Sequence, residues 1–284
     1  MTAVIDSRAL AQSYFDWVRA EVPRLRGPAG IAVLTLAASG EDSRTYRDMI
    51  LKDAESLGLR ARSFEERTGA ALLERIDRLN ADPVTHGIVV MYPLGEGLID
   101  TEVMDRVSPA KDIEGLHSIN LGYLIKFLRY LDEPRGVKCV VPATAKAVVK
   151  TLQAYSEIPI EGAFVVLINN SMRVGKPLGL MLENLGATVV KCYDRTRPED
   201  MEACVRRADI VVTAVPDSRF RLHSGWVKPG AAVVDVSFGG NVDAASLQGR
   251  AAFVSSPDNR IGRMTRAMML VNLIYCARRA EAGL

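Results

Sequence analysis

The chain has 284 residues, which is long enough for two α/β domains of ordinary size. Its 36 basic and 34 acidic residues leave a net charge of +2, so no large positive field is available to hold a nucleic-acid backbone. Its apolar runs are too short to span a bilayer, its start lacks a secretory signal, and its cysteines and histidines lack metal-ligand spacing. We therefore expect a cytoplasmic protein with no nucleic-acid partner, no membrane partner and no metal site.

The first half of the chain alternates helical and strand-like segments. Apolar residues at helical spacing predict a helix over residues 9–20, and a continuous apolar run predicts a buried strand over residues 30–37. A helix starting at Ser43 is expected to stop at Gly58, a typical C-terminal signal. A further helix over residues 70–80 leads into an apolar strand over residues 86–93. This alternation indicates a parallel sheet covered on both faces.

The second half repeats this alternation after a segment, residues 99–135, that is rich in loop signals. A helix over residues 145–155 opens the series, and a long, Met-rich helix over residues 263–280 closes the chain and is expected to pack back on the first domain. The expected strands of this half are residues 163–168, 187–193, 210–215, 231–236 and a short one at 251–254. The pattern predicts an α/β protein with two domains, the second of them doubly wound.

One turn in the second half is typical of a nucleotide site. The strand over residues 163–168 runs into the turn of residues 169–177, which opens a helix whose N–H groups and positive end suit a pyrophosphate. The turn lacks the full G-x-G-x-x-G pattern and is a weak indication alone. The next strand leads to Asp194, whose carboxylate can accept both hydroxyls of an adenosine ribose and repels a 2′-phosphate. Together these features favour NAD over NADP, and the alternative is that Asp194 only caps the following turn.

Several blocks of sequence share one order with a known family. They are the first-helix pair Ser43 and Tyr46 with Gly58, and the runs over residues 87–94, 109–122, 141–144, 169–177 and 261–270. In this order the chain resembles the methylenetetrahydrofolate dehydrogenase/cyclohydrolase family. The resemblance implies a homodimer that oxidises 5,10-methylene-tetrahydrofolate. It also implies a folate domain of residues 1–141 plus 264–284, and a Rossmann-like NAD domain of residues 142–263.

Two departures from the family concern its hydrolytic step. Aligned on the first block without a gap, the family's catalytic lysine falls on Ile50. The glutamine that the family places in the strand starting at Gly87 falls on Met91. The resemblance assigns both polar groups to the cyclohydrolase reaction, which needs a positioned base. Lys52 is no substitute, because residues two apart on a helix face nearly opposite sides. We expect cyclohydrolase activity to be lost, whereas hydride transfer survives because it needs stacking and orientation but no base.

The resemblance also implies residues of the folate site. Tyr46 is expected to stack on or flank the folate ring, with Pro93 and Leu94 beside it. Glu114 replaces the family's pterin-binding aspartate and keeps its chemistry on an arm one methylene longer. The pterin is then shifted, or the ligand is not a standard folate. The alternative for Tyr46 is an ordinary half-buried helix tyrosine.

On the cofactor side, Asn170 stands where NADP-using relatives carry arginine, and Asp194 stands where they carry a small hydroxyl residue. Both changes favour NAD, but Arg195 next to the acid could clamp a 2′-phosphate, which keeps NADP as the less favoured alternative. For Thr265 a plain N-cap role is the alternative to a nicotinamide contact. The residues expected at the cofactor are Asn169, Asn170, Ser171, Val174, Gly175, Asp194, Arg195, Val215, Pro216, Phe238 and Thr265.

The sequence thus predicts an NAD-dependent methylenetetrahydrofolate dehydrogenase without cyclohydrolase activity. Two alternatives stay open. One is a repurposed family member that acts on a different cyclic aminal or iminium compound, which the coincident Ile50, Met91 and Glu114 suggest. The other is a non-catalytic homologue that binds folate or nucleotide.

Overall fold

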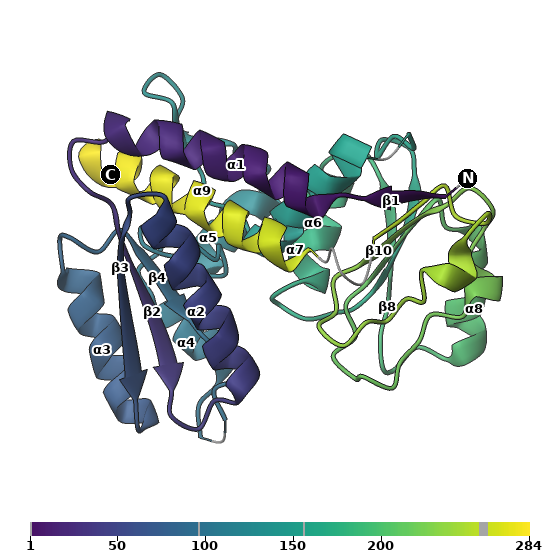
Figure 1. The fold of residues 1–284 in the computed structure, drawn as a ribbon, viewed down its shortest axis with the longest axis horizontal. Helices are drawn as coiled ribbons and strands as arrows, with labels where there is room; N and C mark the ends of the chain where they lie inside the picture. The colour runs from purple at the N-terminus through teal and green to yellow at the C-terminus, as the bar shows by residue number, and fades with distance from the viewer. Residues whose placement is uncertain (1, 96, 156, 256–260) are drawn as a thin grey trace. The chain divides into compact units, whose positions relative to one another are not determined.

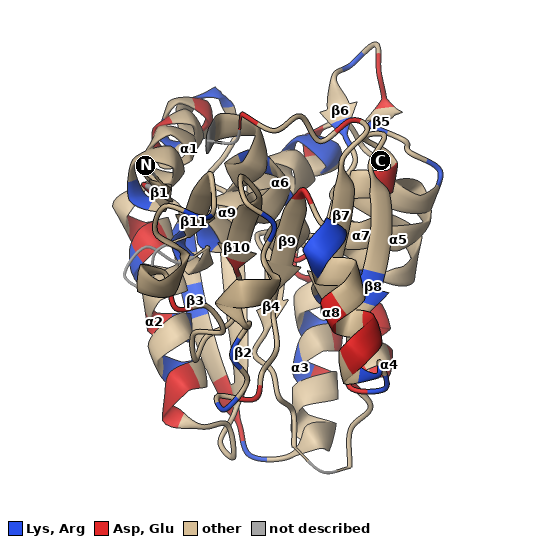
Figure 2. Cartoon of the chain, turned by 90° about the vertical axis from the view of Figure 1, so that its right-hand side faces the viewer, with Lys and Arg blue, Asp and Glu red and all other residues tan. Residues whose placement is uncertain are grey.

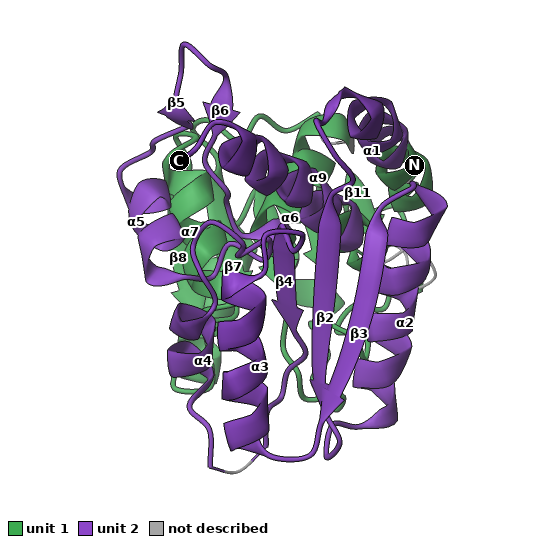
Figure 3. Ribbon diagram, turned by 90° about the vertical axis from the view of Figure 1, so that its left-hand side faces the viewer, with its two compact units in different colours: residues 1–12, 144–265 green, residues 13–143, 266–284 purple. Residues whose placement is uncertain are grey.

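The computed structural model describes residues 2–95, 97–155, 157–255 and 261–284. The chain forms two compact units, which Figure 3 shows in two colours: residues 1–12 and 144–265 make unit 1, and residues 13–143 and 266–284 make unit 2. Each unit is built on its own parallel sheet with helices around it (Figure 1). This confirms the predicted two-domain α/β architecture.

The sheet of unit 2 has three parallel strands in the order β3-β2-β4. The strands are β2 (Gly30–Leu36), β3 (Arg60–Glu66) and β4 (Gly87–Val90). Every residue of the central strand β2 is buried, as its unbroken apolar run predicts. Strand β3 was not expected, because it is an edge strand with charged residues at Arg60, Arg62, Glu65 and Glu66 and no apolar run.

Two helices cover the faces of this sheet. Helices α2 (Glu41–Ser56) and α3 (Gly69–Ala81) lie on opposite faces (Figure 1), because the crossovers from β2 to β3 and from β3 to β4 run in opposite directions along the sheet. Buried leucine and isoleucine side chains of α3 pack into the apolar cluster formed by β2 and β4. Helix α2 stops where predicted, since Gly58 takes a left-handed conformation with φ of +79°.

The remaining elements of unit 2 are short, except for the helices at the two ends of the chain. The loop-rich segment contains two short helices and an antiparallel hairpin, β5 with β6. Helices α1 and α9 contribute residues to both units. The bounds are α1 (Ser7–Glu21), η1 (Val22–Arg24), α4 (Asp100–Arg106), α5 (Ser118–Ile125), β5 (Tyr130–Asp132), β6 (Val137–Lys138) and α9 (Gly262–Glu281).

The sheet of unit 1 has six parallel strands in the order β1-β11-β10-β9-β7-β8. They are β1 (Ala3–Ile5), β7 (Phe164–Ile168), β8 (Thr188–Cys192), β9 (Ile210–Thr213), β10 (Ala232–Asp235) and β11 (Phe253–Ser255). The strand order reverses at β7, which lies between β8 and β9. In doubly wound sheets, such a switch point at the carboxyl ends of the strands is where ligands bind.

Helices α6 (Ala143–Tyr155), α7 (Gly175–Glu183) and α8 (Pro198–Arg207) and two 3-10 turns complete unit 1. The turns are η2 (Ser224–Trp226) and η3 (Ala245–Leu247). Helix α8 carries acidic residues in its first turn and arginines in its last, an order that complements the helix dipole (Figure 2). Within the described residues, the structure contains no helix with the length and apolar character to cross a membrane.

Candidate active site

Three of the residues predicted to bind folate, Tyr46, Pro93 and Leu94, lie on segments that follow the carboxyl ends of strands of unit 2. Strand β2 leads into α2, and β4 leads into the loop of residues 91–94. The hydroxyl of Ser43 in α2 donates to the carbonyl oxygen of Tyr92 over 3.4 Å. The N–H of Met91 donates to the Leu34 carbonyl over 2.9 Å, which extends the pairing of β4 with β2 by one residue. The first turns of α2 and the loop after β4 are therefore tied together.

The position of the family's lysine is apolar and closed to water. Tyr46, Ile50 and Asp53 share one face of α2, because they are spaced four and three residues apart. The Ile50 side chain is 1% exposed and Met91 is 5% exposed. Lys52 is exposed on another part of the helix, as predicted. Neither Ile50 nor Met91 can donate or accept a proton, so neither side chain can serve in general acid–base catalysis.

A cation reaches the same face of α2 from α9. Arg266 Nε donates to Asp53 Oδ2 over 2.6 Å, and the two side chains are 12% and 22% exposed. The guanidinium carbon of Arg266 also lies 5.8 Å from the centre of the Tyr46 ring. Arg266 thus contacts the residues one turn before and one turn after Ile50. Sequence reasoning missed this arginine, because nothing local links the start of α9 to α2.

A buried carboxylate shapes the turn that carries Glu114. The Asp112 carboxylate accepts hydrogen bonds from the N–H of Gly115 (2.9 Å), the N–H of His117 (2.8 Å) and the side-chain amide of Asn120 (2.9 Å). Burial raises the pKa of Asp112, and these donors oppose that rise. Glu114 itself is half-buried in the turn. Asp112 therefore serves the fold of the motif, and Glu114 is left as its candidate ligand-binding acid.

The same turn is held on its other side by α9. The amide of Asn272, fully buried, donates to the carbonyl oxygens of Ile113 and Val141, each over 2.9 Å. Gly115 lies at φ +76°, and a Cβ atom there would come within 2.5 Å of the Val141 carbonyl carbon. Only glycine fits this approach. Asn272 is a second residue that sequence reasoning missed, since its partners lie far away in the chain.

In unit 1, the predicted pyrophosphate turn is built around Asn169 at the switch point. Asn169 Nδ2 donates to the carbonyl oxygen of Ala214, which follows β9, over 2.7 Å. Its Oδ1 accepts from the N–H groups of Ser171 and Gly175, both over 2.9 Å. A Cβ atom on Gly175 would lie 2.1 Å from the Asn169 carbonyl oxygen. Asn169 and Gly175 therefore fix the turn against the start of α7, whereas Asn170 is exposed.

The loop after β9 is held by a buried polar network. Asn241 Oδ1 accepts from the hydroxyl of Thr213 and from the N–H of Val215, each over 2.8 Å. Asp235, at the end of β10, accepts from the N–H of Asn241 over 2.6 Å. The sequence analysis named Val215 as a cofactor residue. It did not name Asn241, which binds the Val215 N–H, or Asp235, which holds Asn241. The signal available was a polar residue, Thr213 or Asp235, at the last position of each of two apolar strands.

Asp194 follows β8, the strand that pairs with β7, and its side chain is 84% exposed. Its contact with Arg195 is a surface ion pair, with 3.6 Å between Nε and Oδ2. The alternative that Asp194 caps the next turn is wrong. The hydroxyl oxygen of Thr196 closes that turn by accepting from the N–H of Tyr193 over 2.9 Å, and the N-cap of α8 is Arg197. The carboxylate is free to meet solvent or a ligand.

Two family models match this chain, and together they cover most of it. The tetrahydrofolate dehydrogenase/cyclohydrolase catalytic domain matches residues 5–114, and the NAD(P)-binding domain of the same enzymes matches residues 142–281. The chain belongs to the tetrahydrofolate dehydrogenase/cyclohydrolase family. The resemblance drawn from the sequence blocks is confirmed at this level.

Individual members of the tetrahydrofolate dehydrogenase/cyclohydrolase family match over their full length. The bifunctional protein FolD of Paraburkholderia xenovorans is 38% identical, covering 100% of this chain and 99% of its own. The 5,10-methylenetetrahydrofolate dehydrogenase of the silkworm Bombyx mori is 30% identical, with a TM-score of 0.87 over 100% of both chains. The Trypanosoma brucei FolD structure, solved with NADP and an inhibitor, is 30% identical, with a TM-score of 0.88 over 99% of this chain and 98% of its own.

Some residues predicted from the family pattern are exposed to solvent, and others are buried in the core or bonded within a helix. Leu94 is 3% exposed and belongs to the core cluster of unit 2, whereas Pro93 is exposed. Phe238 is 71% exposed, and Pro216 is exposed as well. The Thr265 hydroxyl donates to the Ile261 carbonyl oxygen over 3.2 Å, inside the first turn of α9, so the alternative N-cap role is wrong.

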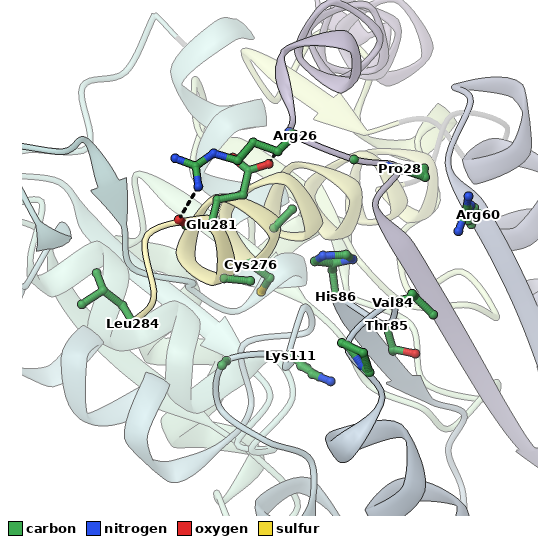
Figure 4. Close-up of a pocket in the computed structure, with 15 residues that line it drawn as sticks. Arg26, Pro28, Arg60, Val84, Thr85, His86, Lys111, Cys276, Glu281 and Leu284 are labelled. Atoms are coloured by element: carbon green, nitrogen blue, oxygen red, sulfur yellow. Dashed lines mark hydrogen bonds between the residues drawn. The ribbon is translucent and has the colours of Figure 1, made fainter.

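A cavity of about 560 Å³ lies in unit 2, and Figure 4 draws the residues that line it. Arg60 and His86, at the starts of β3 and β4, line it, so it lies at the amino edge of the sheet, opposite the edge that carries Tyr46. No predicted site residue lines it. In the described parts of the chain, the structure contains no group of three His, Cys, Asp or Glu side chains placed to hold a metal ion.

Proposed function

We propose that this protein is an NAD-dependent 5,10-methylenetetrahydrofolate dehydrogenase that has lost cyclohydrolase activity. The observation that carries the proposal is that Ile50 and Met91 are both apolar and buried. Cyclohydrolase chemistry adds water to the methenyl cation and needs a positioned proton acceptor. Ile50 and Met91 occupy the two places where the family keeps polar groups, and neither side chain titrates.

Dehydrogenation is compatible with apolar side chains at these two positions. A bound nicotinamide would supply a hydride acceptor for the methylene carbon, and the nitrogens of the folate would spread the resulting positive charge. The protein has to bind and orient the folate and exclude water. We propose that Tyr46 flanks the folate ring, that Pro93 and Leu94 shape the edge beside it, and that Glu114 accepts hydrogen bonds from the pterin.

The features of unit 1 favour NAD as the acceptor. We propose that the turn of Asn169, Asn170 and Ser171 with the start of α7 receives the pyrophosphate, and that Asp194 accepts the ribose hydroxyls. Exposed carboxylates repel a 2′-phosphate, and Asn170 offers that phosphate no charge. Arg195 is the feature that favours NADP, and the FolD of T. brucei was solved with NADP. Both cofactors therefore belong in the test.

A second candidate function is supported by Glu114. Its longer arm, together with Ile50 and Met91, suits a family member that oxidises a different cyclic aminal or reduces an iminium compound. A protein that binds folate or nucleotide without turnover is the third candidate. The resemblance to the family also leads us to propose a homodimer, which light scattering on purified protein tests.

The deciding experiment measures the absorbance of reduced cofactor when purified protein meets 5,10-methylene-tetrahydrofolate with NAD or with NADP. Turnover that is faster with NAD supports the proposal. Binding of NAD, shown by calorimetry, without turnover of the folate supports the repurposed enzyme. Faster turnover with NADP would contradict the assignment of Asp194 and Asn170.

A further inference from the structure

We infer that Arg266 is a positioning residue of the folate site, which fixes the Tyr46 ring from α9 in place of the cation that the family carries at position 50. The inference rests on the proposed function, because Tyr46 is proposed there to flank the folate ring. It assigns a role to a residue that lies far from α2 in the sequence.

The geometry supports this role from two contacts. Arg266 spans the face of α2 across Ile50, with Asp53 on one side at 2.6 Å and the Tyr46 ring on the other at 5.8 Å. The arginine side chain is 12% exposed, so the ion pair is largely screened from water. A guanidinium held at its Nε by a carboxylate keeps one orientation, and a cation near an aromatic ring restricts where that ring can move.

The chemistry of the pair suits dehydrogenation and does not suit hydrolysis. An arginine guanidinium has five N–H donors and no acceptor, so Arg266 cannot serve as the proton acceptor that the family's lysine provides. The Asp53 carboxylate balances its charge. The pair therefore orders the face without adding a net positive charge beside a substrate that becomes a cation on oxidation.

Unit 2 contains a matched control for this pair. Arg75 Nε donates to Glu66 Oε1 over 2.7 Å, and its guanidinium carbon lies 4.6 Å from the centre of the Phe64 ring. The two side chains of that ion pair are 31% and 15% exposed. This arrangement has the same two interactions, a carboxylate and an aromatic ring, but includes no residue proposed to touch folate. Arg75→Met therefore reports the cost to stability alone.

The test compares steady-state kinetics of the wild-type protein, Arg266→Met, Arg266→Lys, Asp53→Asn and Arg75→Met. We expect Arg266→Met to raise KM for methylene-tetrahydrofolate about tenfold and to leave KM for NAD unchanged. Arg266→Lys keeps the charge, so its KM for methylene-tetrahydrofolate should be closer to the wild-type value than that of Arg266→Met. Asp53→Asn should also raise the folate KM, and combining it with Arg266→Met should add little, because the two residues act as one pair. Arg75→Met should leave both KM values unchanged.

The outcomes separate this inference from the proposed function. If the wild-type protein does not oxidise methylene-tetrahydrofolate, the proposed function and this inference both fail. If it does, and Arg266→Met has a folate KM within twofold of the wild type, the inference alone is overturned. Equal changes in both KM values, or the same changes in Arg75→Met, overturn it as well, because they indicate a general loss of stability. Should Arg266→Met fail to fold, Arg266→Lys and Asp53→Asn decide by the same KM comparison.

Discussion

Replacing Asp194 by serine should move cofactor preference from NAD toward NADP by about a hundredfold. The Asp194 side chain is 84% exposed, so its charge acts through water. Two unit charges about 4 Å apart in water interact with about 1 kcal/mol, so a 2′-phosphate of charge near −2 is repelled by about 2 kcal/mol. Losing the hydrogen bonds to the ribose hydroxyls costs NAD about 1 kcal/mol more. Each 1.4 kcal/mol is about tenfold, and the sum of about 3 kcal/mol gives the expected ratio.

The assay is kcat/KM for each cofactor at saturating methylene-tetrahydrofolate. Asp200→Ser is the control for net charge, because Asp200 is an exposed acid of α8 in the same unit, 2.8 Å from Arg197. That variant should keep the wild-type ratio. Adding Asn170→Arg to Asp194→Ser should favour NADP by about a further tenfold, through a charge-assisted contact with the phosphate. A cofactor ratio in Asp194→Ser within twofold of the wild type would refute the assigned role of the carboxylate.

Three further predictions concern the hydrolytic step, the cofactor turn and acid stability. Ile50→Lys alone should not hydrolyse methenyl-tetrahydrofolate, because Met91 still lacks a polar group, and decay of the methenyl absorbance above the uncatalysed rate would contradict this. Gly175→Ala should lower the free energy of unfolding in urea by about 1–3 kcal/mol, because its Cβ would lie 2.1 Å from a backbone oxygen. Gly179→Ala, which meets only the flexible end of a lysine at 3.0 Å, is its control, and equal losses would count against the argument. A hydrogen bond from Arg62 lowers the pKa of Asp82 from 3.8 to about 2. The ionised Asp82 therefore contributes its full stabilisation above pH 4, and this stabilisation is lost as the pH falls toward 2. The melting temperature of Asp82→Asn should therefore fall less between pH 4 and pH 2 than that of the wild type. An equal fall in both proteins would contradict this role of Asp82.

The central strands and the long helices could be predicted because their signals are local. Strands β2, β7 and β9 are unbroken apolar runs, and α2 ends at a glycine that takes a left-handed conformation. The blocks of family sequence could likewise be read in order along the chain. The fold class and the family followed from these signals.

The elements that sequence reasoning missed depend on partners far away in the chain. Strand β1 has three residues and exists through its pairing with β11, and β3 is an edge strand with too many charges to show an apolar pattern. Arg266, Asn272 and Asn241 acquire their roles from contacts that no local pattern encodes. The sequence pointed to the apolar replacements at Ile50 and Met91, and the structure added the cation that crosses the same face.

The most direct test of a dehydrogenase without a hydrolase is product stoichiometry in a single reaction with NAD. The NADH formed and the methenyl-tetrahydrofolate present are followed together, with the uncatalysed loss of methenyl product measured in a sample without protein. We predict that the methenyl compound accumulates in equal amount to NADH after this correction. Formyl-tetrahydrofolate appearing faster than the uncatalysed rate would contradict the claim that the face around Ile50 cannot catalyse hydrolysis.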